Sequence, residues 1–172
     1  MNTKKAKLFP SNEVQNTSYT IRKATMKDFD ELFKFRMLSK KEELKYSAAL
    51  KPLSKTKKYF KEYVKLDLTK RDRVVFVAVE DNKIVGAVLG KYFKPFVISK
   101  YSRKGYMSNL YVDKKYRRRG IGEKLTLKVM NWLRDNKVPY ISVEIHQDNK
   151  PSQKLCKKLG FKNYTVKMVK EF

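Results

Sequence analysis

Residues 105–134, GYMSNLYVDKKYRRRGIGEKLTLKVMNWLR, decide the fold of this chain. The first part alternates like a strand, with one face made by Tyr106, Ser108, Leu110 and Val112. The last part predicts an amphipathic helix, because apolar residues recur at three- and four-residue steps: Ile121, Leu125, Val129, Trp132 and Leu133. A strand therefore passes directly into a helix through the segment RRRGIG at residues 117–122.

The join at residues 117–122 is chemically suited to an anion. Gly120 and Gly122 let backbone N–H groups approach a ligand closely, because no Cβ stands in the way. The first N–H groups of a helix are free, and the positive end of the helix dipole favours an anion such as a phosphate. The guanidinium groups of Arg117, Arg118 and Arg119 add positive charge at the rim. Neither common phosphate loop is indicated, because no Lys-Ser or Lys-Thr pair and no third glycine stand at the required spacing.

Three segments resemble the GNAT superfamily of acetyl-CoA-dependent N-acetyltransferases. The family signature is Arg or Gln, two residues, Gly, one residue, and Gly or Ala, and Arg117, Gly120 and Gly122 match it. The opening IRKATMKD at residues 21–28 resembles the first strand and helix of the family. The run NKPSQKLCKKLGF at residues 149–161 resembles its C-terminal motif. The resemblance covers roughly residues 19–169, nearly the whole chain.

The resemblance implies a binding site for acetyl-CoA as cosubstrate. The pyrophosphate would be held by the backbone of the signature segment: Arg117, Arg118, Arg119, Gly120, Ile121 and Gly122. Main-chain groups of Leu110, Tyr111 and Val112 would pair with the pantetheine arm like an added strand. Asn149, the first residue of the C-terminal motif, is expected in the same site, and its own chemistry predicts a helix cap.

The family mechanism implied is direct attack of a primary amine on acetyl-CoA in a ternary complex, without an acyl-enzyme. The amine would be a peptide or protein N-terminus, a lysine or a small molecule. The backbone N–H of Leu110 or Tyr111 would polarise the carbonyl. Glu144 and His146 share one face of an expected strand and are the candidates for the general base. Glu144 stands where some peptide-N-terminus members carry their base, while His146, the single histidine, titrates in the useful range.

Cys156 departs from the family pattern, in which a tyrosine at this position protonates the departing coenzyme A thiolate. A thiol could serve as a weaker acid. A lone cysteine on the apolar stripe of a helix is more typical of a small core residue. We therefore interpret Cys156 as core, with the thiolate protonated by solvent, by a nearby tyrosine or by Cys156 itself.

The order of predicted elements gives a mixed α/β fold. Strands are expected at residues 19–23, 74–79, 84–91, 106–112, 140–146 and 161–169, with helices after residue 25, within 40–70, from 121 and after 149. The resemblance makes this a GNAT fold, with a central twisted, mostly antiparallel sheet of about six or seven strands, a splayed pair at the coenzyme site and about four flanking helices. Residues 1–18 are expected to be a flexible basic tail, and residues 19–172 a single domain.

The amino-acid composition indicates which classes of partner the chain attracts. The chain has 42 Lys+Arg against 17 Asp+Glu, a formal net charge of +25, which attracts nucleic acid and acidic protein surfaces as well as coenzyme A. The alternative is that the lysines reflect the source organism.

One Cys and one His exclude an intramolecular disulfide and do not make a metal ligand set. No signal-peptide core and no apolar run of about 18 residues is present, so we expect a cytoplasmic protein without membrane insertion, as monomer or homodimer.

Two other functions stay open at this point. One is a catalytically inactive nucleic-acid-binding or ribosome-associated module, and the other is a coenzyme A-binding regulator. The segment 92–104 mixes aromatic and basic residues, which is compatible with a loop beside the acceptor site and with contact to nucleic acid.

Overall fold

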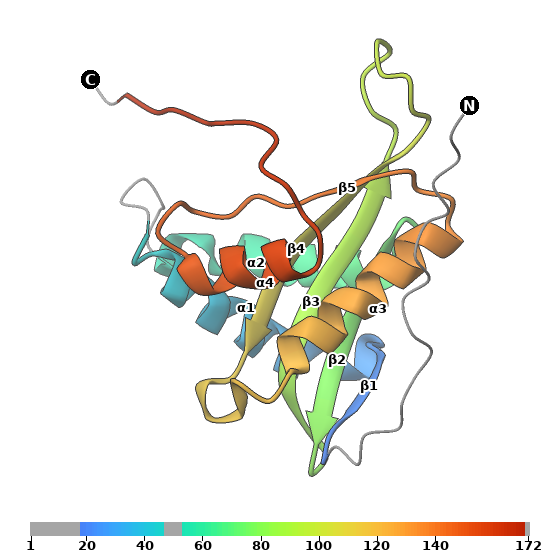
Figure 1. Cartoon of the computed structure of the whole chain (residues 1–172). Coiled ribbons are helices and arrows are strands. Elements are labelled where there is room, and N and C mark those ends of the chain that lie inside the picture. The colour runs from blue at the N-terminus through green and yellow to red at the C-terminus, as the bar shows by residue number, and fades with distance from the viewer. Residues whose placement is uncertain (1–17, 47–52, 171–172) are drawn as a thin grey trace.

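A computed structural model describes residues 18–46 and 53–170, arranged as one sheet with helices on both faces (Figure 1). The strands are β1 (Thr20–Lys23), β2 (Arg73–Glu80), β3 (Lys83–Phe93), β4 (Lys104–Val112) and β5 (Ile141–Ser142). The helices are α1 (Phe29–Glu43), α2 (Leu53–Thr69), α3 (Ile121–Asp135) and α4 (Lys150–Lys158). Short 3-10 turns, η1 (Met26–Asp28) and η2 (Lys114–Tyr116), precede α1 and α3.

The strands lie side by side in chain order, β1-β2-β3-β4-β5. The first four pair antiparallel and β4 pairs parallel with β5, which confirms the mixed, mostly antiparallel α/β class. The predicted count of six or seven strands is wrong, because the described part of the chain contains five. Residues 161–169 alternate like a strand but form none, and the expected strand at 140–146 shrinks to two residues. A segment with strand propensity forms no strand unless the edge of a neighbouring strand offers it backbone hydrogen bonds.

A bulge in β4 breaks the alternation that the sequence predicts. Ala87 pairs with Tyr111 and Leu89 with Ser108, so two residues of β4 oppose the single Val88. Asn109, one of these two, has φ +54°. The bulge shifts the faces, so that Met107 and Leu110 both contact the core beneath α3, although the sequence placed them on opposite faces.

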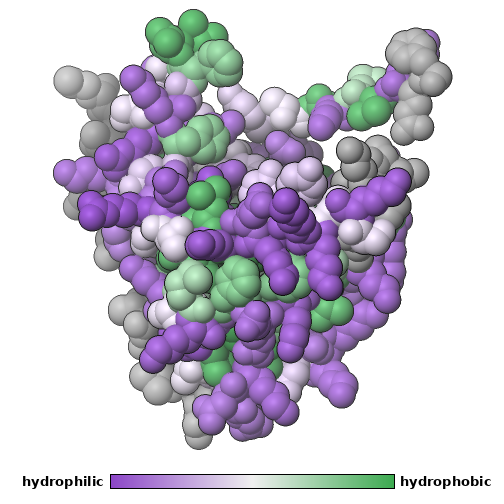
Figure 2. Space-filling model, turned by 180° about the vertical axis from the view of Figure 1, so that it is seen from behind, coloured by the Kyte–Doolittle hydropathy of each residue, from purple (hydrophilic) through white to green (hydrophobic). Residues whose placement is uncertain are grey.

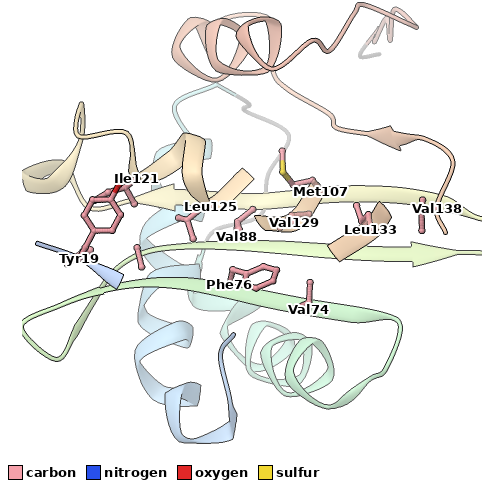
Figure 3. Packing of buried hydrophobic residues seen from close by; sticks show 12 residues of the cluster. Tyr19, Val74, Phe76, Val88, Met107, Ile121, Leu125, Val129, Leu133 and Val138 are labelled. Carbon is pink, nitrogen blue, oxygen red and sulfur yellow. The ribbon is translucent and has the colours of Figure 1, made fainter. Parts of the chain in front are cut away.

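The two faces of the sheet carry separate hydrophobic cores. On one face α3 packs with its fully buried stripe of Ile121, Leu125, Val129 and Leu133, which Figure 3 shows pointing at side chains of β2, β3 and β4. On the other face α1 and α2 cover a second cluster: Leu32, Phe35, Val64, Val75, Val77, Ile84, Ala87, Leu89 and Tyr111. The buried stripe of α3 therefore packs against the sheet, and the first turn of the helix lies at the end of β4.

Local capping signals set several helix boundaries. Thr25 and Asp28 form a capping box before α1, and the N–H of Thr25 donates to Asp28 Oδ2 at 2.7 Å. Asn149 caps α4, where its side-chain oxygen accepts from the N–H of Ser152 at 3.2 Å. Gly160 follows the end of α4 with φ +86°, a left-handed conformation that glycine adopts at low cost.

Among residues 18–46 and 53–170, no helix is long and apolar enough to span a bilayer. The expected N-terminal tail, residues 1–18, lies outside the described residues except for Ser18.

The close approach of α3 to β3 gives a first prediction. A Cβ on Gly90 would lie 2.6 Å from Val129 Cγ1, closer than side chains pack. We expect Gly90→Ala to lower the free energy of unfolding by about 1–3 kcal/mol, because overpacking outweighs the smaller gain from a stiffer unfolded chain. In urea unfolding of the double-mutant cycle with Val129→Ala, the double variant should lose less than the sum of the single losses. Strictly additive losses would contradict the packing.

Candidate coenzyme and acceptor site

The end of β4 leads through a short loop to the start of α3 (Figure 1). Asp113 begins the loop, and its side chain accepts from the N–H of Lys115 at 3.0 Å. The backbone then enters the left-handed region twice, at Arg118 with φ +67° and at Gly120 with φ +77°. Gly120 is the residue just before α3, and Ile121, the first residue of the helix, is buried to 1% exposure. The loop is therefore fixed at both ends by packed structure.

The loop presents a row of free backbone donors. Within residues 18–46 and 53–170, the N–H groups of residues 118–123 donate to no protein acceptor. The first bond of the helix is donated by Lys124 to the carbonyl of Gly120, at 3.0 Å. Free N–H groups at the positive end of a helix form an anion site. The loop thus presents the free N–H groups at a helix N-terminus that the anion site predicted from Gly120 and Gly122 requires.

Two of the three arginines serve a different purpose from the rim charges that the sequence suggests. Arg119 forms a bidentate pair with Glu80, at 2.6 and 3.0 Å, and also donates to Ser18. Arg117 donates to Glu42 at 2.8 and 3.0 Å and to the carbonyl of Val112 at 2.9 Å.

These pairs clamp the loop to β2 and to the end of α1. Sequence reasoning missed Glu42 and Glu80, because no local pattern connects them with the loop. Arg118 makes no ion pair in the described part of the chain and stays exposed.

The clamp formed by the Arg119–Glu80 and Arg117–Glu42 pairs depends on pH through the pKa of Glu80. Hydrogen bonds from Arg119 and then from Ser18 lower the pKa of Glu80 below its ordinary value. The clamp therefore holds fully above the ordinary carboxylate range and loosens as the pH falls through the lowered pKa. Tyr19 adds a further tie, because its hydroxyl donates to the carbonyl of Arg119 at 3.3 Å.

Apolar side chains from three elements meet beside the loop. A Cβ on Gly122 would lie 3.6 Å from Leu155 of α4 and 3.9 Å from both Leu110 and Val112 of β4. Tyr111 points to the opposite face, where its ring meets Phe35 edge-on with centroids 5.6 Å apart. Of the three predicted pantetheine residues, Leu110 and Val112 thus lie with the glycine loop, while the side chain of Tyr111 belongs to the other core.

β5 diverges from β4 next to this cluster. The two strands pair only at Gly105 and Tyr106, before the bulge. Leu110 has no partner in the register with β3, so it lies in the bulge that faces the divergence. The predicted splayed pair is present: the strands separate after Tyr106, and β4 continues alone to the loop that precedes α3.

The candidate bases lie on the segment that follows β5. Glu144 is exposed and close to Tyr106. The pKa of Tyr106 is raised, first by burial and then by the charges of Glu144 and Glu43. The charges of two carboxylates from different elements therefore act on one tyrosine, and the ammonium of Lys91 lies 5.2 Å from the centre of the same ring. Sequence reasoning missed Tyr106 and Glu43 as site residues, and the only signal available was the exposed-face position of Tyr106 on its strand.

His146 faces the end of α1 instead. Its ring stacks on Tyr46 with centroids 5.6 Å apart, and its Nδ1 accepts from the N–H of Asp148 at 3.2 Å. This holds the segment after β5 against α1. His146 and Glu144 therefore have different neighbours, and only Glu144 shares the surroundings of Tyr106.

Cys156 is buried on α4, with 6% of its surface exposed, and it belongs to neither of the two large clusters. Burial raises the pKa of its thiol, which keeps the group protonated. Across residues 18–46 and 53–170 no group of three His, Cys, Asp or Glu side chains is placed to hold a metal ion. A cavity of about 30 Å³ lies between α1, α2 and the sheet, room for about one water molecule and not for a nucleotide.

Fold and site together define an α/β domain with a splayed strand pair and a helix N-terminus whose N–H groups donate to no acceptor in the described residues. Sequence comparison gives the family. The model of the acetyltransferase (GNAT) family matches residues 35–161, and the chain belongs to this family. It is a GNAT-family acetyltransferase, as the resemblance of the signature segment predicts.

Relatives agree with this assignment. An N-alpha-acetyltransferase of Saccharolobus solfataricus is 28% identical over 153 residues, which covers 86% of this chain and 83% of the relative. Human N-alpha-acetyltransferase 30 is 34% identical over 89 residues, or 52% of this chain and 24% of that protein. In fold, the chain resembles the crystal structure of a Clostridium acetobutylicum acetyltransferase with acetyl-CoA, with a TM-score of 0.71, 24% identity, and coverage of 89% of this chain and 96% of that one.

The clamp on the loop gives a second prediction. Glu80→Gln removes the charge that holds Arg119, so we expect faster amide hydrogen exchange, by about tenfold, at the hydrogen-bonded amides of Arg117 and Lys124 that bound the loop. Glu62→Gln is the matched control, because Glu62 is an exposed carboxylate on α2 without an ion pair in the described residues. Mass-spectrometric exchange at neutral pH measures both. Equal exchange at these amides in the two variants would show that Glu80 does not order the loop.

Proposed function

We propose that this enzyme transfers an acetyl group from acetyl-CoA to the α-amino group of a polypeptide N-terminus. The observation that carries the proposal is the row of unpartnered N–H groups at residues 118–123, at the start of a buried helix. Family membership supports acetyl-CoA as the donor. The names of the related proteins, N-alpha-acetyltransferases, support a terminal α-amine over a lysine or a small amine.

The residues present fit the coenzyme. The pyrophosphate would accept from the free N–H groups at Gly120, Ile121 and Gly122, with the unpaired guanidinium of Arg118 beside it. The pantetheine arm would lie along the bulged part of β4, next to Leu110 and Val112. Arg117 and Arg119 would support the loop through their carboxylate partners. Asn149 would act through its cap on α4, which places Leu155 against Gly122.

The acceptor amine would enter near Tyr106. The charges of Glu144 and Glu43 both act on this tyrosine in a chain of net charge +25, although Glu43 also pairs with Lys40 and the ammonium of Lys91 lies 5.2 Å from the centre of the Tyr106 ring. Carboxylates attract the ammonium form of a peptide N-terminus and stabilise the positive charge that develops during attack. An acceptor with one positive charge suits this site better than a polycation, which the rest of the surface repels.

In the transfer itself, Glu144 would take the proton from the amine, directly or through a water molecule. The neutral nitrogen forms the new C–N bond at the thioester carbonyl and then releases its second proton to solvent. The N–H of Leu110 or Tyr111 donates to the oxyanion, and the C–S bond then breaks. The released thiolate takes a proton from solvent or from a nearby tyrosine. The burial and raised pKa of Cys156 support its role as a core residue and weaken its candidacy as this acid.

The coenzyme site gives a third prediction. Gly120→Glu places a carboxylate against the pyrophosphate, so we expect acetyl-CoA affinity to fall at least about a hundredfold. Gly160→Glu is the control, because Gly160 has the same left-handed backbone, φ +86°, and no neighbour within 4 Å. Both variants carry similar backbone strain and the same charge change. Isothermal titration calorimetry with acetyl-CoA measures both, and equal affinities would overturn the coenzyme site.

The acceptor site gives a fourth prediction. Glu144→Gln should lower kcat about a hundredfold with acetyl-CoA affinity unchanged, because only proton removal is lost. Asp148→Asn, a nearby exposed carboxylate, should retain turnover.

Turnover should be measured with two peptides of one sequence containing a lysine, one with a free N-terminus and one blocked there. Acetylation of the blocked peptide at an equal rate would reassign the acceptor to lysine. Acetyl-CoA binding without turnover on either peptide would favour a coenzyme-binding module.

A further inference from the structure

The connection between β3 and β4 carries an apolar apex at its tip. Phe96, Val97 and Ile98 are 89%, 97% and 97% exposed. The N–H of Ser99 donates to the carbonyl of Phe96 at 2.9 Å, which closes a turn with Val97 and Ile98 at its two central positions. Such positions usually carry Pro, Gly, Asn or Asp, because those residues favour the turn conformation. Two branched aliphatic side chains there gain nothing from folding, so their exposure requires another explanation.

The loop stands away from the body of the molecule beyond the ends of β3 and β4 (Figure 1). Contacts at its base hold it there. Arg103 donates to the carbonyl of Asn136 at 2.6 Å and lies over the ring of Tyr92 at 5.2 Å. Tyr101 packs on Tyr140 with centroids 5.0 Å apart. These contacts anchor the base next to the end of α3 and leave the apex free.

Basic residues surround the apex. Residues 91–104, which include the end of β3, the loop and the start of β4, contain no Asp or Glu. Their cations are Lys91, Lys94, Lys100, Arg103 and Lys104. In Figure 2 a hydrophobic patch stands at the extreme end of the molecule, with hydrophilic side chains directly below it. The apex thus combines full apolar exposure with uncompensated positive charge.

We propose that this loop docks the enzyme on an anionic lipid bilayer, with Phe96, Val97 and Ile98 inserted among the acyl chains and the surrounding cations at the headgroups. Apolar side chains gain from leaving water, and each nearby Lys or Arg gains from the negative surface potential. The proposal departs from the expectation of no membrane insertion, which rested on the lack of an apolar run long enough to span a bilayer, because shallow contact with a bilayer surface needs no such run.

Other occupants fit the apex less well. A single-stranded nucleic acid would use the cations and could stack on Phe96, but Val97 and Ile98 have no ring to stack on a base and would stay in water. A second copy of the chain would bring two surfaces of net charge +25 together, which repel each other. A bilayer of anionic lipid satisfies both the apolar and the charged parts of the loop.

The test is co-sedimentation of the full chain with lipid vesicles of two compositions, phosphatidylcholine alone and equal parts of phosphatidylcholine and phosphatidylglycerol. We expect binding to the mixed vesicles only. The triple variant F96S/V97S/I98S keeps the net charge and should lose at least about tenfold in partition coefficient. The control Y59S/Y63S also removes exposed apolar side chains, 59% and 51% exposed on α2, and should bind like the wild type.

Insertion can be followed separately from charge. In a Trp132→Phe background, Phe96→Trp should show a blue-shifted fluorescence on addition of mixed vesicles, and part of the binding should survive high salt. Acetyl-CoA binding of each variant checks that it is folded. Equal binding of the apex variant and the wild type would overturn the proposal. So would failure of the wild type to bind mixed vesicles, whether or not it binds a short RNA in parallel.

Discussion

The packing of α3 against the sheet is the interaction on which the rest of the structure depends. Ile121, Leu125, Val129 and Leu133 are almost fully buried, and Gly86 and Gly90 of β3 let the helix approach closely. Because this stripe fixes the axis of α3, it also fixes where the first turn of the helix points. The free N–H groups of the loop are useful for binding only while that turn is held beside the end of β4. Core packing and the proposed coenzyme site thus depend on the position of the same helix.

Acidic residues are scarce in this chain, and several of them form ion pairs that stabilise the site. Glu42 and Glu80 hold Arg117 and Arg119, so these arginines stabilise the loop instead of crowding the space for a phosphate. The charges of Glu144 and Glu43 both act on Tyr106, in a strongly basic molecule. The overall positive charge draws anions to the surface, and the proposed acceptor site lies where these carboxylates act.

Much of the architecture followed from patterns in the chain. The strand, glycine loop and helix at residues 105–134, the strands β2 and β3, and the cap by Asn149 were all predicted, because each depends on neighbours in sequence. The sixth strand was predicted wrongly. Residues 161–169 have the alternation of a strand, but a strand also needs a partner edge, and β5 pairs over two residues only. The bulge at Asn109 could not be anticipated, since regular alternation was the simplest interpretation of β4.

The sequence by itself determined the family, the glycine signature, the helix stripe and the net charge, because these are properties of short segments or of composition. Only the tertiary structure decided which groups meet. Arg117 pairs with Glu42, 75 residues away in the chain, and Arg119 pairs with Glu80, 39 residues away. The charges of Glu43 in α1 and of Glu144 after β5 act on Tyr106. No periodicity encodes such pairs, since they form only when the sheet brings distant segments to one edge. The same is true of the bulge, which depends on how two strands fit against each other and not on either strand alone.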